Sequence, residues 1–244
     1  MQLHIYKNAD VLNKIFADWL VNYINTTLQV QDKFSIVLSG GNTPQKLNEL
    51  LASENYKNKI DWRKLHFFWG DERFVSLNDE RNNAKMAFDT LLNHIPVVKE
   101  NIHIIPTENI TPEASAQQYE NVIQQYFQQH YSSFDLVLLG MGNDGHTLSL
   151  FPHQPVIYEN KKWVTSFWLL SQNMYRITLT ALIVNKAKCI TFLVTGTDKA
   201  SALKEVLEGE KNIDLYPSQI IQPTQGALHW FVDEAAAGLL NSHK

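Results

Sequence analysis

Two side chains that can exchange protons with water stand close together near the middle of the chain. The segment 140–147 reads Gly-Met-Gly-Asn-Asp-Gly-His-Thr and carries Asp144 and His146. An imidazole titrates near neutral pH, so His146 is suited to act as a general base. A free carboxylate is a much weaker base, and we expect Asp144 to orient the imidazole or to bind sugar hydroxyl groups. The pair predicts acid–base catalysis.

The glycines of the same segment offer a second interpretation. Gly140, Gly142 and Gly145 match the G-x-G-x-x-G fingerprint of dinucleotide-binding sites, but such a site needs a helix that begins within the loop. Pro152 and Pro155 follow closely, and a proline inside a helix costs ~3 kcal/mol. Since no helix of useful length fits between Gly145 and Pro152, we expect no nucleotide cofactor.

A second glycine-bearing loop, Ser39-Gly40-Gly41-Asn42-Thr43-Pro44, follows an apolar run. Glycines let backbone N–H groups converge, and the positive end of a helix dipole attracts anions, so this loop suits a phosphate. A tight turn in which Thr43 caps the next helix explains the same residues equally well. Ser39, Gly40, Gly41 and Thr43 are therefore candidate phosphate-binding residues.

Four charged side chains stand at or near the ends of other predicted strands, namely Asp71, Arg73, Arg176 and Lys199. Asp71 and Arg73 belong to Gly70-Asp71-Glu72-Arg73, a cluster that is also typical of a surface turn. Arg176 is equally explained as an ordinary charge at a strand edge. Lys199 in the first turn of a helix opposes the helix dipole, so it needs an anionic partner or solvent. Together with the glycine loops, these residues predict a site for a phosphorylated small molecule.

The elements that must position these residues alternate along the chain. Apolar spacing predicts a first helix over 11–24, and further helices are expected from Pro44, over 84–92, after the cap Thr111 and after the cap Asp233. Apolar runs predict strands at 35–38, 65–69, 136–139, 177–179, 190–194 and 228–232. This alternation favours a mainly parallel, Rossmann-like sheet between helical layers, with ligands at the carboxyl ends of its strands.

Composition limits the classes of function. The chain has 244 residues, 44% of them hydrophobic, and we expect one globular domain over residues 1–244. The formal net charge of −4, without a dense Lys/Arg cluster, argues against nucleic acid. No signal peptide or bilayer-spanning stretch is found, so we expect no membrane association and a cytoplasmic location. The single cysteine, Cys189, excludes an internal disulfide and a Cys-based metal site.

These motifs resemble, in the same order, those of the 6-phosphogluconolactonases. The match comprises Ser-Gly-Gly-x-Thr-Pro from Ser39, Trp-Gly-Asp-Glu-Arg from Trp69, the segment 139–152, Arg-Ile-Thr-Leu-Thr from Arg176 and Gly-x-x-Lys-Ala from Gly196. The resemblance implies a three-layer α/β/α sandwich, shared with glucosamine-6-phosphate deaminases and one type of ribose-5-phosphate isomerase. It also implies hydrolysis of 6-phospho-D-glucono-1,5-lactone to 6-phosphogluconate in the oxidative pentose phosphate pathway.

The resemblance also implies roles for single residues. It places Lys199 and Arg176 on the 6-phosphate and Asp71 among the residues that bind the sugar-phosphate lactone. The developing oxyanion is expected to meet either backbone N–H groups of the loop or Arg73. The leaving group is an intramolecular alkoxide that the imidazolium of His146 can protonate, so we expect neither a metal ion nor a cofactor. The oligomeric state is left open, with a monomer favoured.

Two other functions compete with lactone hydrolysis. The related deaminases share the Gly-Gly-x-Thr loop and the Asp-Gly-His core. They typically carry an aromatic residue where this chain has Arg73, and a glutamate where it has Thr147–Pro152. A sugar-phosphate sensor without turnover would not need the intact Asp-Gly-His core. The chain departs from the lactonase pattern at Trp168–Tyr175, which lacks Pro and Lys, and at Asn82, where many members have serine.

Overall fold

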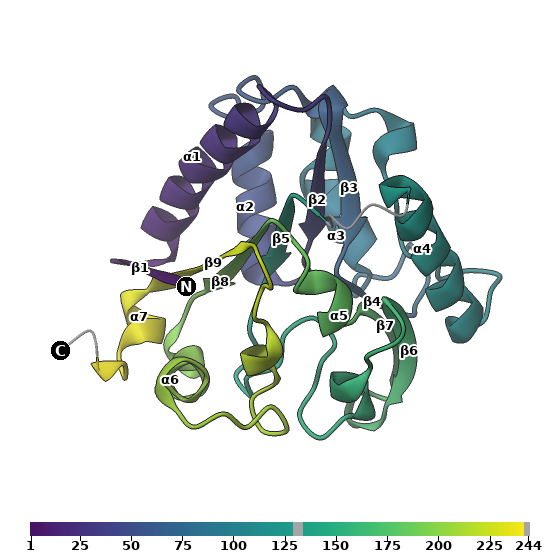
Figure 1. The fold of residues 1–244 in the computed structure, drawn as a ribbon. Coiled ribbons are helices and arrows are strands. Elements are labelled where there is room, and N and C mark those ends of the chain that lie inside the picture. Colours follow the sequence, from purple (N-terminus) through teal and green to yellow (C-terminus); the bar gives the residue numbers. More distant parts are fainter. Residues whose placement is uncertain (129–133, 242–244) are drawn as a thin grey trace.

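A parallel sheet of six strands forms the centre of the computed structural model, which describes residues 1–128 and 134–241 (Figure 1). The strand order is β1-β9-β8-β5-β2-β3, and all neighbouring strands are parallel. The bounds are Gln2–Tyr6 (β1), Phe34–Leu38 (β2), Leu65–Trp69 (β3), Leu136–Leu139 (β5), Cys189–Val194 (β8) and Ala227–Asp233 (β9). The predicted α/β fold with a mainly parallel sheet is confirmed.

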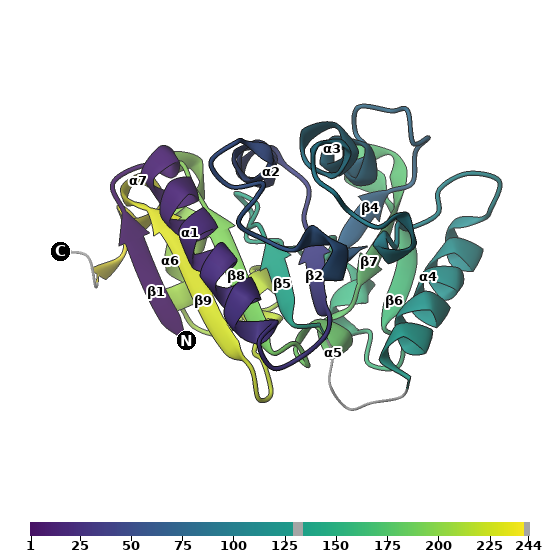
Figure 2. The same ribbon diagram turned by 90° about the horizontal axis from the view of Figure 1, so that it is seen from above.

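Helices cover both faces of this sheet. Figures 1 and 2 show α1 (Ala9–Thr27) and α2 (Asn42–Ala52) on one face, with α5 (Ala181–Val184) and α6 (Ala200–Glu208) on the other. The remaining α-helices of the described residues are α3 (Asn83–Thr90), α4 (Pro112–Phe127) and α7 (Glu234–Ala237). Within residues 1–128 and 134–241, no helix has the length and apolar character needed to cross a membrane.

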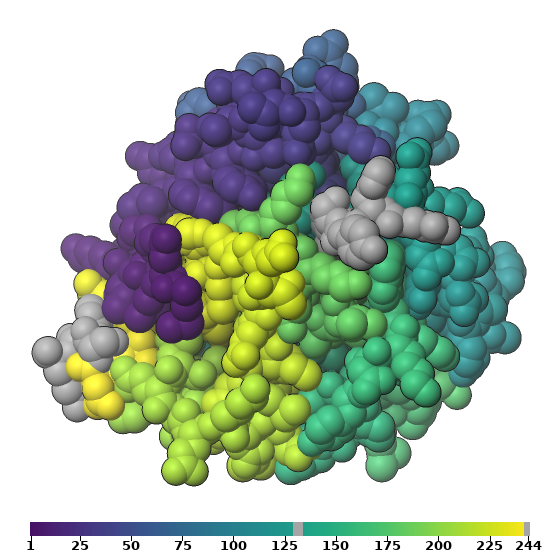
Figure 3. Space-filling view, viewed as in Figure 1, coloured from purple at the N-terminus to yellow at the C-terminus, as the bar shows by residue number. Residues whose placement is uncertain are grey.

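The central strands are mainly apolar, as expected of parallel strands covered on both faces, with single polar residues such as Ser35 in β2 and Thr191 in β8. All residues of β2, β5 and β8 are buried. The two ends of the chain also meet in this sheet, because β1 pairs with β9. In Figure 3 the purple N-terminal atoms accordingly lie beside the yellow atoms near the C-terminus. The alternating pattern of β1 was not recognised in the sequence.

Three strands form a second, antiparallel sheet that the sequence patterns did not predict. Its order is β4-β7-β6, with β4 at Asp71–Arg73, β6 at Val164–Leu169 and β7 at Met174–Leu179. The strand predicted at 177–179 is part of β7, but it pairs in this second sheet. The interpretation of Asp71–Arg73 as a surface turn is wrong, because Asp71 is only 7% and Glu72 only 1% exposed.

The predicted elements are found with ends that differ from the prediction by at most three residues, and one of these differences concerns the site. β3 and β5 have the predicted ends, and the side chains of Thr111 and Asp233 cap α4 and α7. Helix α2 begins at Asn42, two residues before Pro44, and its N-cap is Gly41, which has φ of 104° and no side-chain cap. The prediction that Thr43 caps this helix is therefore wrong, since Thr43 lies inside it.

Candidate active site

A cavity of about 220 Å³ opens where the loops after β2, β3 and β5 meet the second sheet. Its lining residues are Ser39, Gly40, Gly41, Asp71, Arg73, Asn83, Gly140, Met141, Gly142, His146, Thr147, Leu148, Arg176 and Lys199. The structure thus brings together all the predicted site residues except two. Asp144 does not line this cavity but contacts His146, which does. Thr43 lines a neighbouring cavity.

The loop after β5 holds the imidazole of His146 in one orientation. Nδ1 of His146 lies 2.5 Å from Oδ1 of Asp144, and the same oxygen accepts the backbone N–H of His146 at 3.1 Å. Burial opposes ionisation of Asp144, but the contacts with His146 outweigh it and hold the pKa of Asp144 below its usual value. An ionised Asp144 accepts a hydrogen bond from a protonated Nδ1. The neutral ring is then left with Nε2 as its basic nitrogen.

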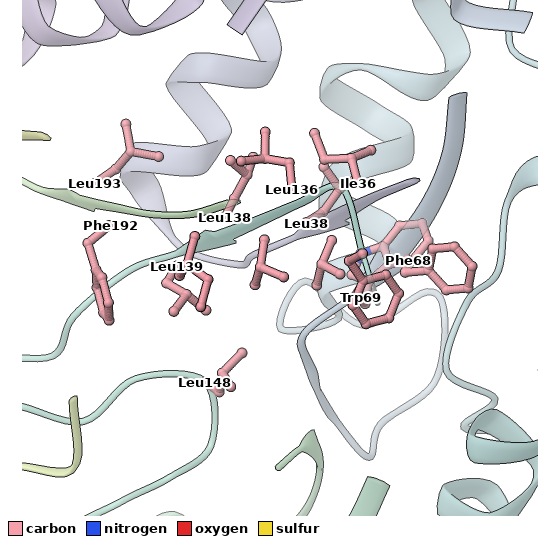
Figure 4. Close-up of a cluster of buried hydrophobic side chains, with 14 of the residues drawn as sticks. Ile36, Leu38, Phe68, Trp69, Leu136, Leu138, Leu139, Leu148, Phe192 and Leu193 are labelled. Carbon is pink, nitrogen blue, oxygen red and sulfur yellow. The ribbon is translucent and has the colours of Figure 1, made fainter. Parts of the chain in front are cut away.

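Hydrogen bonds and an apolar anchor fix this loop. The backbone N–H of Gly142 donates to the carbonyl of His146 at 2.8 Å, and Oγ1 of Thr147 donates to the carbonyl of Gly140 at 2.8 Å. Leu148 adopts a left-handed φ of 54° and is 7% exposed. Figure 4 shows its side chain beneath the apolar residues of the central sheet. Packing therefore ties the position of His146 to the core of the fold.

Position 142 has no room for a side chain. A Cβ built on Gly142 would overlap Nδ1 of His146 and would lie 2.5 Å from Oδ1 of Asp144. Glycine is needed at this position because the side chains of His146 and Asp144 approach its backbone closely. Gly145 differs, because its φ of 77° is one that other residues rarely adopt. Of the three glycines that resemble a dinucleotide fingerprint, Gly142 thus serves to pack the Asp144 and His146 side chains against the backbone.

Arg176 is buried in the wall of the cavity with part of its guanidinium unpaired. It is 4% exposed and lies on β7, the middle strand of its sheet, so the interpretation as an ordinary edge charge is wrong. Nη2 donates to Oε1 of Gln172 at 2.8 Å, whereas Nε and Nη1 have no hydrogen-bond partner among the described residues. The carboxylate of Asp71 lies 3.7 Å from Nη1 of Arg176. It also accepts a hydrogen bond from the hydroxyl of Ser149 at 2.6 Å. Buried N–H groups without acceptors indicate a place for a polar or anionic ligand.

A second guanidinium adds to the positive charge of this wall. Arg73 on β4 lies directly opposite Arg176 in the antiparallel register. Burial lowers the pKa of Arg176, and the charge of Arg73 lowers it further while Asp71 opposes this. Nη1 of Arg73 donates to the carbonyl of Arg81 at 2.7 Å, but its buried Nε has no partner among the described residues. Like charges opposite each other destabilise a strand pair, so a bound anion would relieve their repulsion.

A neighbouring cavity of about 310 Å³ shares Gly40, Gly41, Gly140, Met141 and Lys199 with the first. It contains the uncapped start of α2, whose first N–H groups have no partner within the helix and favour an anion. Oγ1 of Thr43 lies 3.0 Å from Oγ1 of Thr195 at this place. Lys199 ends the short 3₁₀-helix Thr197–Lys199 just before α6, and its Nζ lies 3.0 Å from Asp198. The prediction that Lys199 lies in the first turn of α6 is therefore wrong. Its anionic partner is Asp198.

Sequence reasoning missed two residues that support the site, Glu72 and Asn83. The carboxylate of Glu72 accepts three backbone N–H groups, from Arg73 at 2.8 Å, Asn83 at 2.7 Å and Ala84 at 2.9 Å. Burial raises the pKa of Glu72 to about 7, although these N–H groups lower it. Nδ2 of Asn83 donates to the carbonyl of Asp71 at 2.9 Å. No local sequence pattern marks Glu72, because β4 consists of three charged residues.

We expect Glu72→Ala to destabilise the protein by about 3 kcal/mol, because three backbone N–H groups, two of them buried, would lose their acceptor. Urea unfolding measures this loss. Glu108→Ala is the matched control, because Glu108 also accepts a backbone N–H, that of Leu77 at 3.0 Å, but is exposed. We expect a much smaller loss for the control, as is usual for substitutions at exposed positions. Equal losses in the two variants would show that Glu72 does not tie α3 to β4.

Comparison with known proteins places this arrangement in one class. The model of the family described as glucosamine-6-phosphate isomerases/6-phosphogluconolactonase matches residues 7–230. The chain belongs to this family. A 6-phosphogluconolactonase of Synechocystis is 37% identical over 238 residues, covering 96% of each chain. One of Haemophilus influenzae is 37% identical over 212 residues, covering 87% of this chain and 90% of the relative.

Solved structures agree in fold. A crystal structure described as devB protein superimposes with a TM-score of 0.88 at 34% identity and covers 97% of this chain and 98% of its own. The 6-phosphogluconolactonase of Trypanosoma cruzi has a TM-score of 0.85 at 25% identity, covering 98% and 97%. A monomeric glucosamine-6-phosphate deaminase reaches 0.81 at 20% identity, covering 98% of this chain and all of its own, a likeness of fold alone.

Proposed function

We propose that this protein hydrolyses 6-phospho-D-glucono-1,5-lactone to 6-phosphogluconate and that His146 is the general base. One observation carries the role of His146. Its Nδ1 is held by Asp144 at 2.5 Å, so that Nε2 is the basic nitrogen of a side chain lining the cavity. The reaction is supported by membership of the family and by relatives that are named 6-phosphogluconolactonases. Hydrolysis of this lactone is a step of the oxidative pentose phosphate pathway. The cytoplasmic location of the protein stays a prediction.

In this proposal, Nε2 of His146 removes a proton from water as the water oxygen attacks C1 of the lactone. Negative charge develops on the former carbonyl oxygen, and we assign its stabilisation to Arg73, whose buried Nε lacks a partner among the described residues. When the intermediate collapses, the bond between C1 and the ring oxygen breaks. The imidazolium then returns its proton to that ring oxygen, so the base is regenerated. Each step uses only groups of the chain, water and the lactone.

We place the 6-phosphate where the two cavities join. Lys199, Gly40 and Gly41 line both cavities, and Arg176 faces the first of them. Ser39 borders the first cavity and Thr43 the second. This position combines the cations with the uncapped start of α2, an arrangement that favours a phosphate. The sugar ring would then reach from the junction toward His146.

The related deaminase activity is the competing proposal, since a deaminase shares the fold. Ring opening of an amino sugar by this family pattern needs a glutamate after Asp-Gly-His, but this chain has no carboxylate in Thr147–Pro152. The test is to assay one preparation for lactone hydrolysis above the spontaneous rate and for ammonia release from glucosamine 6-phosphate. We expect the first reaction and not the second. Ammonia release faster than lactone hydrolysis would overturn the proposed function.

Removing the cation at the junction tests the position of the phosphate. We expect Lys199→Ala to raise KM for the phosphorylated lactone on the order of tenfold, because a charge-assisted hydrogen bond is lost. KM for unphosphorylated gluconolactone is expected to change little. Lys161→Ala is the control, because it removes the same charge from an exposed residue outside both cavities. Equal damage to both substrates would assign Lys199 to folding or to the chemical step.

A further inference from the structure

One aromatic side chain contacts both an acid–base residue and a cationic residue of the site. The ring of Phe151 stacks on the imidazole of His146, with centroids 4.1 Å apart and planes 29° apart. The guanidinium carbon of Arg176 lies 5.5 Å from the centroid of the same ring. Phe151 is 7% exposed and does not line the cavity, whereas His146 and Arg176 do. Its ring therefore contacts these two residues within the protein interior rather than across the cavity.

We propose that Phe151 is the positioning residue that aligns His146 and Arg176 with each other, so that one ring sets the spacing between base and anion site. This inference rests on the proposed function, because it assigns those roles to His146 and Arg176. Asp144 fixes only one edge of the imidazole, through Nδ1. The face of Phe151 restricts the tilt of the imidazole, which a hydrogen bond at one nitrogen leaves free.

The electronic character of the ring supports this role. The face of an aromatic ring carries partial negative charge and attracts a cation that lies within about 6 Å of the centroid. Arg176 is a cation throughout, and His146 becomes one when it takes the proton from water. The ring therefore stabilises the imidazolium, which forms only during the reaction, as well as the buried guanidinium. Gln172 gives Arg176 a second contact, at 2.8 Å from Nη2.

The variants Phe151→Leu and Phe151→Tyr separate positioning from simple packing. We expect Phe151→Leu to lower kcat about three- to tenfold and to raise KM for the phosphorylated lactone by a similar factor. With unphosphorylated gluconolactone, only kcat should fall. Phe151→Tyr keeps the ring and should restore both values to near those of the wild type. Phe127→Leu is the matched control, because Phe127 is 8% exposed, packs against other aromatic rings and does not line the cavity.

A spectroscopic readout tests the geometry without turnover. A proton over an aromatic face resonates upfield, so the ring protons of His146, assigned by their loss in His146→Gln, should be upfield in the wild type. They should move downfield in Phe151→Leu but not in Phe151→Tyr or Phe127→Leu. Unchanged His146 resonances, unchanged kcat and KM in Phe151→Leu, or no rescue by Phe151→Tyr would overturn the proposal. Absence of lactone hydrolysis by the wild type would instead refute the proposed function, since the resonances report the stacking regardless.

Discussion

His146→Ala should lose most of the catalysed rate of lactone hydrolysis, on the order of 10²–10⁴-fold in kcat, as is typical when a general base is removed. The reason is that His146 is the one imidazole among the described residues that line the cavity. Asp144 cannot take over the proton, because a free carboxylate is a much weaker base than an imidazole. Steady-state kinetics with the phosphorylated lactone, corrected for spontaneous hydrolysis, measures the loss.

A second histidine provides the control for this variant. His153 is exposed, lies shortly after His146 in the chain and does not line the cavity. Its φ of 61° is tolerated by asparagine, so His153→Asn removes an imidazole with little strain. We expect the control to retain the wild-type rate. Near-wild-type hydrolysis by a folded His146→Ala protein would remove His146 from the mechanism.

Gly142→Ala should lower kcat by about 10²-fold, although it leaves every charged group of the site in the chain. The new methyl group would overlap the imidazole of His146 and crowd Asp144. Both side chains must therefore move away from residue 142. A misplacement of about 1 Å in a catalytic group costs on the order of 10²-fold in rate. The variant should still fold, because the displaced imidazole is 28% exposed and can move toward solvent.

The control for this substitution is Gly238→Ala. A Cβ at Gly238 would meet its nearest neighbour at 3.5 Å, which is ordinary contact. We expect this variant to show the wild-type kcat and an unchanged thermal transition. If Gly142→Ala kept the wild-type kcat, the close packing of the loop against His146 would not matter for the chemistry.

Five of the six strands of the central sheet and most of the helices around them were predictable because they produce local patterns, whereas β1 was not recognised. β3 and β5 are short apolar runs, and Thr111-Pro112-Glu113 is a complete helix start, so neighbouring residues alone indicate them. The second sheet was not predictable in this way. Its strand β4 consists of Asp71–Arg73, whose burial depends on partners outside the strand, such as Asn83 and the more distant Ser149.

The site shows the same division. The contact of Asp144 with His146 spans two residues, so the sequence could offer it as one of two roles for Asp144. Arg73 lies opposite Arg176 because of the register of β4 against β7. These strands lie about 100 residues apart in the chain, so no local pattern indicates the pair. The start of α2 was misplaced because Thr43 and Pro44 are residue types typical of a helix start, whereas the true N-cap, Gly41, has no side chain that could cap the helix.

A crystal structure with 6-phosphogluconate bound tests the central claim most directly, because this product carries both the carboxylate made from the lactone carbonyl and the phosphate. Our account predicts the carboxylate within hydrogen-bond distance of Nε2 of His146 and near Arg73. It predicts the phosphate at the junction of the cavities, in contact with Lys199. A product bound in the reverse direction, with its phosphate beside His146, would contradict the assignment of His146 as the base that activates water at the lactone carbonyl.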